Sequence, residues 1–118
     1  MNVIVLGASS NPERYSYKAV VKFKSKGYTV FPVGKKKGTI EEMEILASPP
    51  EDINVDIVSI YLNKQNQLPY YDYLMNLKPG FVIFNPGTEN SELEEMLTLE
   101  GVKTEEACSL VLLSIGEL

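Results

Sequence analysis

The sequence has 118 residues, of which 44% are apolar and 23% are charged, and this composition predicts one globular domain, residues 1–118, with its own core. Apolar runs such as Val3–Leu6 and Leu110–Leu113 are far too short to span a membrane, and we expect no signal peptide. The absence of histidine excludes phosphohistidine chemistry and His-dependent triads. The single cysteine, Cys108, excludes an internal disulfide and predicts a cytoplasmic protein.

The formal net charge of −5 conceals a strong asymmetry along the chain. Residues 1–40 carry eight basic groups and one acid, whereas residues 41–118 carry three basic groups and fifteen acids. A globally acidic protein is a poor binder of nucleic acids and anionic membranes, so we expect neither as a partner. The basic first third fits one small, multiply phosphorylated ligand, although the four lysines between Lys18 and Lys26 also fit a simple solvated helix face.

Strand and helix patterns alternate through the first half of the chain. The continuous apolar run Val3–Leu6 predicts a buried parallel strand. Ser16 is a suitable N-cap for a helix over Tyr17–Lys26, and Tyr28–Val33 predicts a second strand. The stretch Lys35–Asn54 has no clean period, so we expect a long connection with one turn of helix or a short edge strand.

The alternation continues to the end of the chain. The patterns predict strands at Asp56–Leu62, Phe81–Phe84 and Val102–Thr104, a helix with Pro69 in its first turn, a helix opened by a capping box of Ser91 and Glu94, and a last helix at Ser109–Ser114. Crossovers of helical length between strands predict an α/β fold, an open parallel sheet of about five strands with helices on both faces. Right-handed crossovers place every strand-to-helix loop at one edge of the sheet, where ligands of such sheets bind.

Small and polar residues follow the first strand, from Gly7 to Asn11. Their backbone amides could approach a pyrophosphate closely, with the N-terminus of the first helix behind them. The loop is not the dinucleotide-binding fingerprint, because Ser9 and Pro12 stand where that motif has glycines. A tight turn that needs small residues explains this loop equally well.

Three consecutive cations, Lys35, Lys36 and Lys37, follow the second strand, where an NAD-binding domain places an acid. Cations at this position suit a ribose that carries a phosphate, as in NADP or coenzyme A. An exposed loop of solvated lysines is the alternative. After the fourth strand, the turn Asn85–Asn90 either offers its amides to a ligand or only joins a strand to a capped helix.

Three segments carry a family resemblance: Gly7-Ala8-Ser9 with Asn11-Pro12-Glu13-Arg14-Tyr15-Ser16, then Ile83-Phe84-Asn85-Pro86-Gly87-Thr88-Glu89-Asn90, and finally Glu106-Ala107-Cys108-Ser109-Leu110-Val111. In this order they resemble the small stand-alone CoA-binding proteins of bacteria, which are similar to the CoA-binding domain of the succinyl-CoA synthetase alpha subunit. The resemblance implies a Rossmann-like sheet that holds the adenosine-diphosphate end of CoA on the first two loops and passes the pantetheine arm along the third and fourth. The chain departs from the family after Val33, where Gly34 and Lys35 replace Asn-Pro, and we expect no glycine-containing hairpin in the stretch that follows.

The strand-end loops and the resemblance together predict a site for CoA or an acyl-CoA. Its expected binding residues are Gly7, Ala8, Ser9, Ser10, Asn11, Arg14, Tyr15, Ser16, Val33, Gly34, Lys35, Lys36, Tyr61, Leu62, Asn63, Asn85, Pro86, Gly87 and Cys108. We expect no catalytic machinery and no metal, because Cys108 has no histidine to activate it and its place before an apolar run is typical of a buried small residue. An NADP-binding enzyme or subunit and a ligand-free regulatory module stay open, as do a homodimer and an unidentified protein partner.

Overall fold

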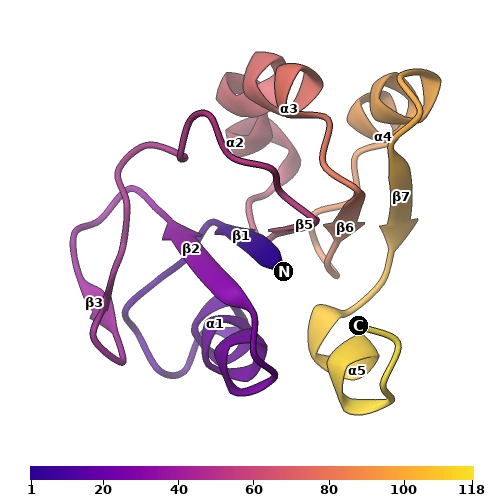
Figure 1. Ribbon diagram of the computed structural model, residues 1–118. Coiled ribbons are helices and arrows are strands. Elements are labelled where there is room, and N and C mark those ends of the chain that lie inside the picture. Colours follow the sequence, from indigo (N-terminus) through magenta and orange to yellow (C-terminus); the bar gives the residue numbers. More distant parts are fainter.

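The fold of residues 1–118, taken from a computed structural model, alternates strands and helices along the chain (Figure 1). Its elements are β1 (Asn2–Leu6), α1 (Tyr15–Ser25), β2 (Thr29–Val33), β3 (Thr39–Ile40), β4 (Met43–Glu44), β5 (Ile57–Ile60), α2 (Lys64–Gln67), the 3-10 turn η1 (Leu68–Tyr70), α3 (Tyr71–Leu77), β6 (Phe81–Phe84), α4 (Ser91–Leu99), β7 (Lys103–Glu106) and α5 (Ser109–Ser114). No helix is both long enough and apolar enough to cross a bilayer.

One sheet of five parallel strands, in the order β2-β1-β5-β6-β7, forms the centre of the molecule. The chain first moves outward from β1 to β2, then returns to the other side of β1 and continues outward through β5, β6 and β7. The direction therefore reverses between β1 and β5, and the loops that leave their carboxyl ends diverge there. This confirms the predicted Rossmann-like α/β fold.

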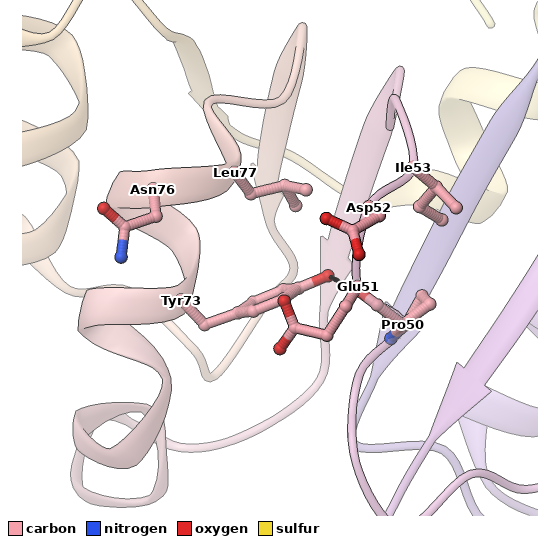
Figure 2. A pocket seen from close by; sticks show the side chains of 7 residues that line it. All are labelled: Pro50, Glu51, Asp52, Ile53, Tyr73, Asn76 and Leu77. Atoms are coloured by element: carbon pink, nitrogen blue, oxygen red, sulfur yellow. Dashed lines mark hydrogen bonds between the residues drawn. The ribbon is translucent and has the colours of Figure 1, made fainter.

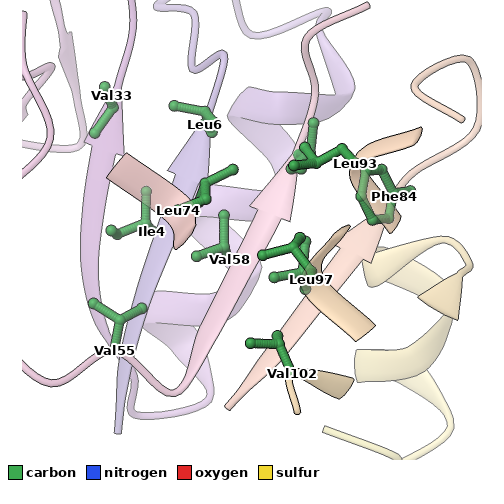
Figure 3. Packing of buried hydrophobic residues seen from close by; sticks show 12 residues of the cluster. Ile4, Leu6, Val33, Val55, Val58, Leu74, Phe84, Leu93, Leu97 and Val102 are labelled. Carbon is green, nitrogen blue, oxygen red and sulfur yellow. The ribbon is translucent and has the colours of Figure 1, made fainter. Parts of the chain in front are cut away.

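Helices cover both faces of the sheet (Figure 1). Alternate residues of β1 point to opposite faces, so Ile4 belongs to one buried cluster and Val5 to the other. On the first face, leucines of α3 and α4 pack against the strands, as Figure 3 shows for Leu74, Leu93 and Leu97. On the second face, α1 and α5 supply the apolar residues Ala19, Val20, Phe23 and Leu113. Burial on both faces explains why the central strands have continuous apolar sequences rather than alternating ones.

The first helix begins two residues earlier than predicted, at Tyr15, and its N-cap is Arg14 rather than Ser16. Asn11 causes this early start, because its side-chain oxygen accepts from the amide of Glu13 and its carbonyl accepts from the amide of Arg14. The chain therefore turns into the helix directly after Pro12. Ser16 lies inside the first turn and is buried.

The connection after β2 contains an antiparallel hairpin of β3 and β4, which the sequence analysis did not expect. The two turn residues, Glu41 and Glu42, both have positive φ, at 46° and 73°. Such a turn normally requires Asn-Gly or a similar pair, and the Glu-Glu sequence gives no sign of it. The hairpin is tied back to β2 by the bridge between Val33 and Leu46.

Smaller corrections concern the ends of other elements. The third strand is shorter than predicted, Ile57–Ile60, and the last begins at Lys103 and runs to Glu106. Pro69 lies in η1 between two helices, because Asn63 already caps α2 by accepting from the amide of Asn66. The N-cap of α4 is Asn90 rather than Ser91. The predicted bounds of the fourth strand and of the last helix are confirmed.

Candidate functional site

A cleft of about 450 Å³ lies at the carboxyl edge of the sheet, beside the point where the strand order reverses. It is lined by Gly7, Ser9, Arg14, Tyr15, Ser16, Lys36, Tyr61 and Pro86. These residues come from the loops after β1, β2, β5 and β6 and from the start of α1. Four loops that are distant in sequence therefore meet in one place, as the right-handed parallel topology requires.

The first loop is fixed to the end of β2 by its own backbone. The amides of Gly7 and Ala8 both donate to the carbonyl of Val33, at 2.8 Å each, and the amide of Asn11 donates to the Ser9 hydroxyl. Three of the amides that we expected to approach a pyrophosphate, those of Gly7, Ala8 and Asn11, are therefore already hydrogen-bonded within the chain. Only Ser9 and Ser10 keep backbone amides that make no hydrogen bond within the chain.

Gly7 has φ of +99°, and a side chain at this position would meet the end of β5. A Cβ there would lie 2.9 Å from the carbonyl carbon of Tyr61 and 3.1 Å from the Leu62 side chain. Gly7 is therefore required by the close approach of the first loop to the end of β5. Gly34 has a similar role on the other side, since a Cβ there would collide with the carbonyl oxygen of Ala8.

The charges at the cleft are positive. Arg14 and Lys36 are its charged residues, and no carboxylate lines it. Arg14 is also the N-cap of α1 and makes no side-chain capping bond, so the first amides of this 11-residue helix lack a capping acceptor. Two side-chain cations and the positive end of a helix dipole therefore face one cavity, which favours an anion. Lys35 and Lys37 are exposed and do not line the cleft.

The turn after β6 is held from inside by Asn85, whose side chain is 1% exposed. Its Nδ2 donates to the Ser59 hydroxyl at 2.9 Å and to the carbonyl of Ile60 at 2.8 Å. Its Oδ1 accepts from the amide of Ser109 at 2.8 Å, and the Ser59 and Ser109 hydroxyls lie 2.8 Å apart. The side chain of Asn85 thus connects the ends of β5 and β6 with the start of α5. Its neighbour Pro86 is exposed and lines the cleft.

A second buried network joins the loops after β5 and β6. Gln67 is fully buried, and its amide group donates to the carbonyls of Leu62 and Thr88. Asn90 donates to the side-chain oxygen of Gln67 and to the hydroxyl of Tyr71, both at 2.8 Å. The polar residues after β6 therefore join this turn to α2 and α3 by hydrogen bonds, which agrees with the alternative that the turn has a structural role.

Tyr61 is the residue of the cleft with an unsatisfied polar group. Tyr61 is one of the residues that line the cleft, whereas its hydroxyl is buried and has no hydrogen-bond partner. Burial and the nearby Cys108 thiol raise the pKa of Tyr61 to about 12, and the adjacent Ser59 and Ser109 side chains act in the opposite direction. The phenol is therefore neutral at physiological pH and retains its proton for donation.

Comparison with known proteins identifies the family. A model of the CoA binding domain matches residues 1–114. The chain belongs to the CoA-binding domain family. This confirms the resemblance carried by the three sequence segments. None of the curated proteins compared with this chain matches it.

Solved structures share the fold of this CoA-binding domain. A crystal structure of an uncharacterized protein is 45% identical, has a TM-score of 0.95, and the match covers 99% of this chain and 97% of that one. A cell-free-produced protein from Thermus thermophilus is 23% identical, with a TM-score of 0.85 over 99% and 90% of the two chains. Acetyl-coenzyme A synthetase 1 of Ca. Korarchaeum cryptofilum, solved with phosphate and ADP, is 20% identical, with a TM-score of 0.69 over 90% of this chain and 25% of that one.

The cleft of the CoA-binding domain brings together eight of the residues predicted from sequence. Of the others, Ser10, Asn11, Lys35 and Gly87 are exposed near the strand ends, Asn63 caps α2, and Leu62 packs against the core. Ala8, Val33, Gly34 and Asn85 are buried. Cys108 is half-buried rather than fully buried as expected. The predicted contacts of these residues with a ligand stay predictions.

Sequence reasoning missed three buried polar residues that support the site, Ser59, Gln67 and Ser109. Ser59 interrupts the apolar strand Asp-Ile-Val-Ser-Ile-Tyr-Leu, and a serine inside such a run could have indicated a buried hydrogen bond. Gln67 carried no such signal, because it lies in a polar segment that reads as solvent-exposed.

A second cavity, of about 230 Å³, lies at the opposite edge of the sheet (Figure 2). Glu51 and Asp52 from the segment before β5 face Tyr73 of α3 there. Tyr73 donates to the carbonyl of Pro50 at 2.6 Å, and burial, with the Glu51 carboxylate nearby, raises the pKa of Tyr73. An acidic cavity repels phosphate, so the cleft at the carboxyl edge is the better candidate in a CoA-binding domain.

Proposed function

We propose that this protein binds CoA or an acyl-CoA in the cleft at the carboxyl edge of the sheet. The observation that supports the proposal best is the charge of this cleft, where Arg14, Lys36 and the uncapped start of α1 converge and no acid is present. Phosphate groups are bound by this combination of donors and dipole. Membership of the CoA-binding domain family supports CoA as the source of the phosphates.

In the proposed complex, the diphosphate lies near Arg14 and the free amides of Ser9 and Ser10. The remaining arm follows the wall made by Tyr61 and Pro86. Lys36, next to the end of β2, is placed to pair with a phosphate on the ribose, as expected from the cations at this position. NADP carries such a phosphate as well, and for that reason it is the necessary competitor in any test.

We further propose that the protein binds its ligand without transforming it. The polar side chains beneath the cleft, Asn85, Ser59 and Ser109, are engaged in hydrogen bonds with one another. The chain has no histidine that could act as a general base or activate Cys108. The lone free thiol fits a reducing compartment such as the cytoplasm.

Isothermal titration of the full chain with CoA, dephospho-CoA, NADP and NAD tests this proposal. We expect CoA to bind most tightly, and at a hundred times its dissociation constant it should stabilise the fold by about 2.7 kcal/mol. Arg14→Gln should weaken CoA binding about tenfold or more through loss of a charged hydrogen bond. Lys26→Gln is the matched control, because Lys26 caps the opposite end of the same helix.

Other outcomes would favour the other hypotheses. Tighter binding of NADP than of CoA would support a nicotinamide-dependent enzyme or subunit. No binding of any of the four compounds, with no CoA retained in native mass spectrometry of freshly purified protein, would support a regulatory module that has lost its ligand.

A further inference from the structure

The buried hydroxyl of Tyr61 has no partner in a protein that otherwise satisfies the polar groups beneath its cleft. A buried polar group without a hydrogen bond destabilises a folded protein, and such groups are rare. The hydroxyl lies beside the Ser59 and Ser109 hydroxyls and the Cys108 thiol. Tyr61 is also one of the residues that line the cleft.

The hydrogen bonds of the polar cluster around Tyr61 leave the hydroxyl of this residue without a partner. Ser59 and Ser109 share one hydrogen bond, so one of their two hydroxyl hydrogens has no acceptor, while Ser59 also accepts from Asn85. The hydroxyl hydrogen of Tyr61 has no acceptor either. A phenol can donate one hydrogen bond, so a carbonyl oxygen within reach of this hydroxyl would give it a partner.

Tyr61 can present its hydroxyl to the cleft without breaking a hydrogen bond, because the hydroxyl makes none. Its backbone stays in place during such a rotation, since its amide donates to the carbonyl of Leu6 at 2.7 Å. A ligand that offers an acceptor gains a hydrogen bond and removes the cost of the unsatisfied group. These properties distinguish Tyr61 from Tyr15, the other cleft tyrosine, whose side chain is exposed to water.

We propose that Tyr61 is a specificity-determining residue, whose hydroxyl donates a hydrogen bond to a carbonyl oxygen on the arm of the bound CoA ligand. This inference rests on the proposed function of the cleft. Two carbonyl sources share this chemistry: the thioester of an acyl-CoA, and the amides of the pantetheine arm that every CoA compound carries. The first source makes the protein selective for acylated CoA, and the second does not.

The test uses calorimetric titration of the full chain with CoA, acetyl-CoA and S-ethyl-CoA. S-ethyl-CoA resembles acetyl-CoA in size but lacks the thioester carbonyl. Each compound is titrated into the wild-type protein, into Tyr61→Phe and into Tyr70→Phe. Tyr70 is a suitable control because it is half-buried, lies outside the cleft and makes no side-chain hydrogen bond.

We expect Tyr61→Phe to weaken acetyl-CoA binding by about three- to tenfold, the usual effect of one hydrogen bond, and Tyr70→Phe to have no effect. If only acetyl-CoA is affected, the thioester is the acceptor; if all three compounds are affected equally, a pantetheine amide is. Unchanged affinity of Tyr61→Phe for all three compounds, while the wild-type protein binds them, would overturn the inference. Failure of the wild-type protein to bind any of them would instead refute the proposed function.

A thermal measurement on the unliganded protein separates this role from a structural one. Removing a hydroxyl that has no partner should leave the melting temperature unchanged or raise it. A fall of several degrees in Tyr61→Phe would show that the hydroxyl stabilises the free protein, and would contradict the argument on which the inference depends.

Discussion

Gly7→Ala is the substitution whose cost can be worked out most directly from the geometry. At φ of +99°, any side chain is strained, which costs about 1–3 kcal/mol. The added Cβ would also lie 2.9 Å from the carbonyl carbon of Tyr61, which is backbone and cannot move aside. Tyr61 is held by its amide hydrogen bond to Leu6, so relief of the clash must disturb the pairing of β1 with β5.

Two further glycines separate the contributions to this cost. Gly27 has φ of +91° and nothing within 4 Å of an added Cβ, so Gly27→Ala measures the backbone strain alone. Gly34 has an unstrained φ but faces the Ala8 carbonyl, so Gly34→Ala gives the cost of a steric clash with backbone in the absence of strain. Overpacking of this kind costs about 1–3 kcal/mol. We therefore expect Gly7→Ala to lose about 2–6 kcal/mol of stability, more than Gly27→Ala by the steric contribution.

Urea unfolding at equilibrium provides the assay, with far-UV circular dichroism and tyrosine fluorescence as probes, since the chain has no tryptophan. Free energies are compared only where the dependence on urea concentration is the same in all variants. Equal losses of stability in Gly7→Ala and Gly27→Ala would refute the reasoning, because they would show that the first loop does not press against the end of β5.

Three other predictions follow from the site. Asn85→Ala should destabilise the fold by about 3–5 kcal/mol, because it leaves the Ile60 carbonyl and the Ser109 amide buried without partners. In urea unfolding, a loss of stability no larger than that of the exposed cap variant Asn63→Ala would contradict this. In calorimetric titrations, Lys36→Ser should weaken CoA binding about tenfold and dephospho-CoA binding less, whereas Lys37→Ser, outside the cleft, should change neither affinity. Equal effects of the two variants would show that Lys36 makes no specific contact with the ligand. The pKa of Tyr61, raised to about 12 in the folded state, makes the unfolded state lose its proton first, so stability should fall as pH rises from 10 towards 12; denaturation curves of Tyr61→Phe that decline as steeply would exclude Tyr61 as the cause.

The strands and the topology could be predicted from sequence because strands that are buried on both faces have continuous apolar sequences. Phe81–Phe84 is a short apolar run between Gly80 and a polar turn, and its bounds need no tertiary information. The helix starts were less predictable, because Asn90 and Ser91 are both good N-caps. The choice is made by Gln67 and Tyr71, which bind the Asn90 side chain from a distant part of the chain.

The position of the cleft could be predicted from sequence, but the structural roles of the residues around it could not be predicted. The order of strands and loops was sufficient to bring Gly7, Lys36, Tyr61 and Pro86 together. It could not show that Asn85 turns inward or that the amides of Gly7 and Ala8 are already occupied by Val33. Such details depend on hydrogen bonds between distant residues. The Glu41–Glu42 turn could not be predicted for a related reason, because its conformation is imposed by the hairpin rather than by its sequence.

The separation of charge along the chain becomes a separation in space, since α1 and the loop after β2 occupy one side of the molecule and α4 and β7 the other (Figure 1). A polyphosphorylated ligand that diffuses towards a protein of net charge −5 is repelled from most directions and attracted from the side where the cleft opens. The long-range electrostatic field therefore acts mainly on the association rate, and close contacts act mainly on the dissociation rate. Raising the ionic strength from 0.01 M to 0.1 M shortens the screening length from about 30 Å to about 10 Å, so association should slow markedly while dissociation changes little.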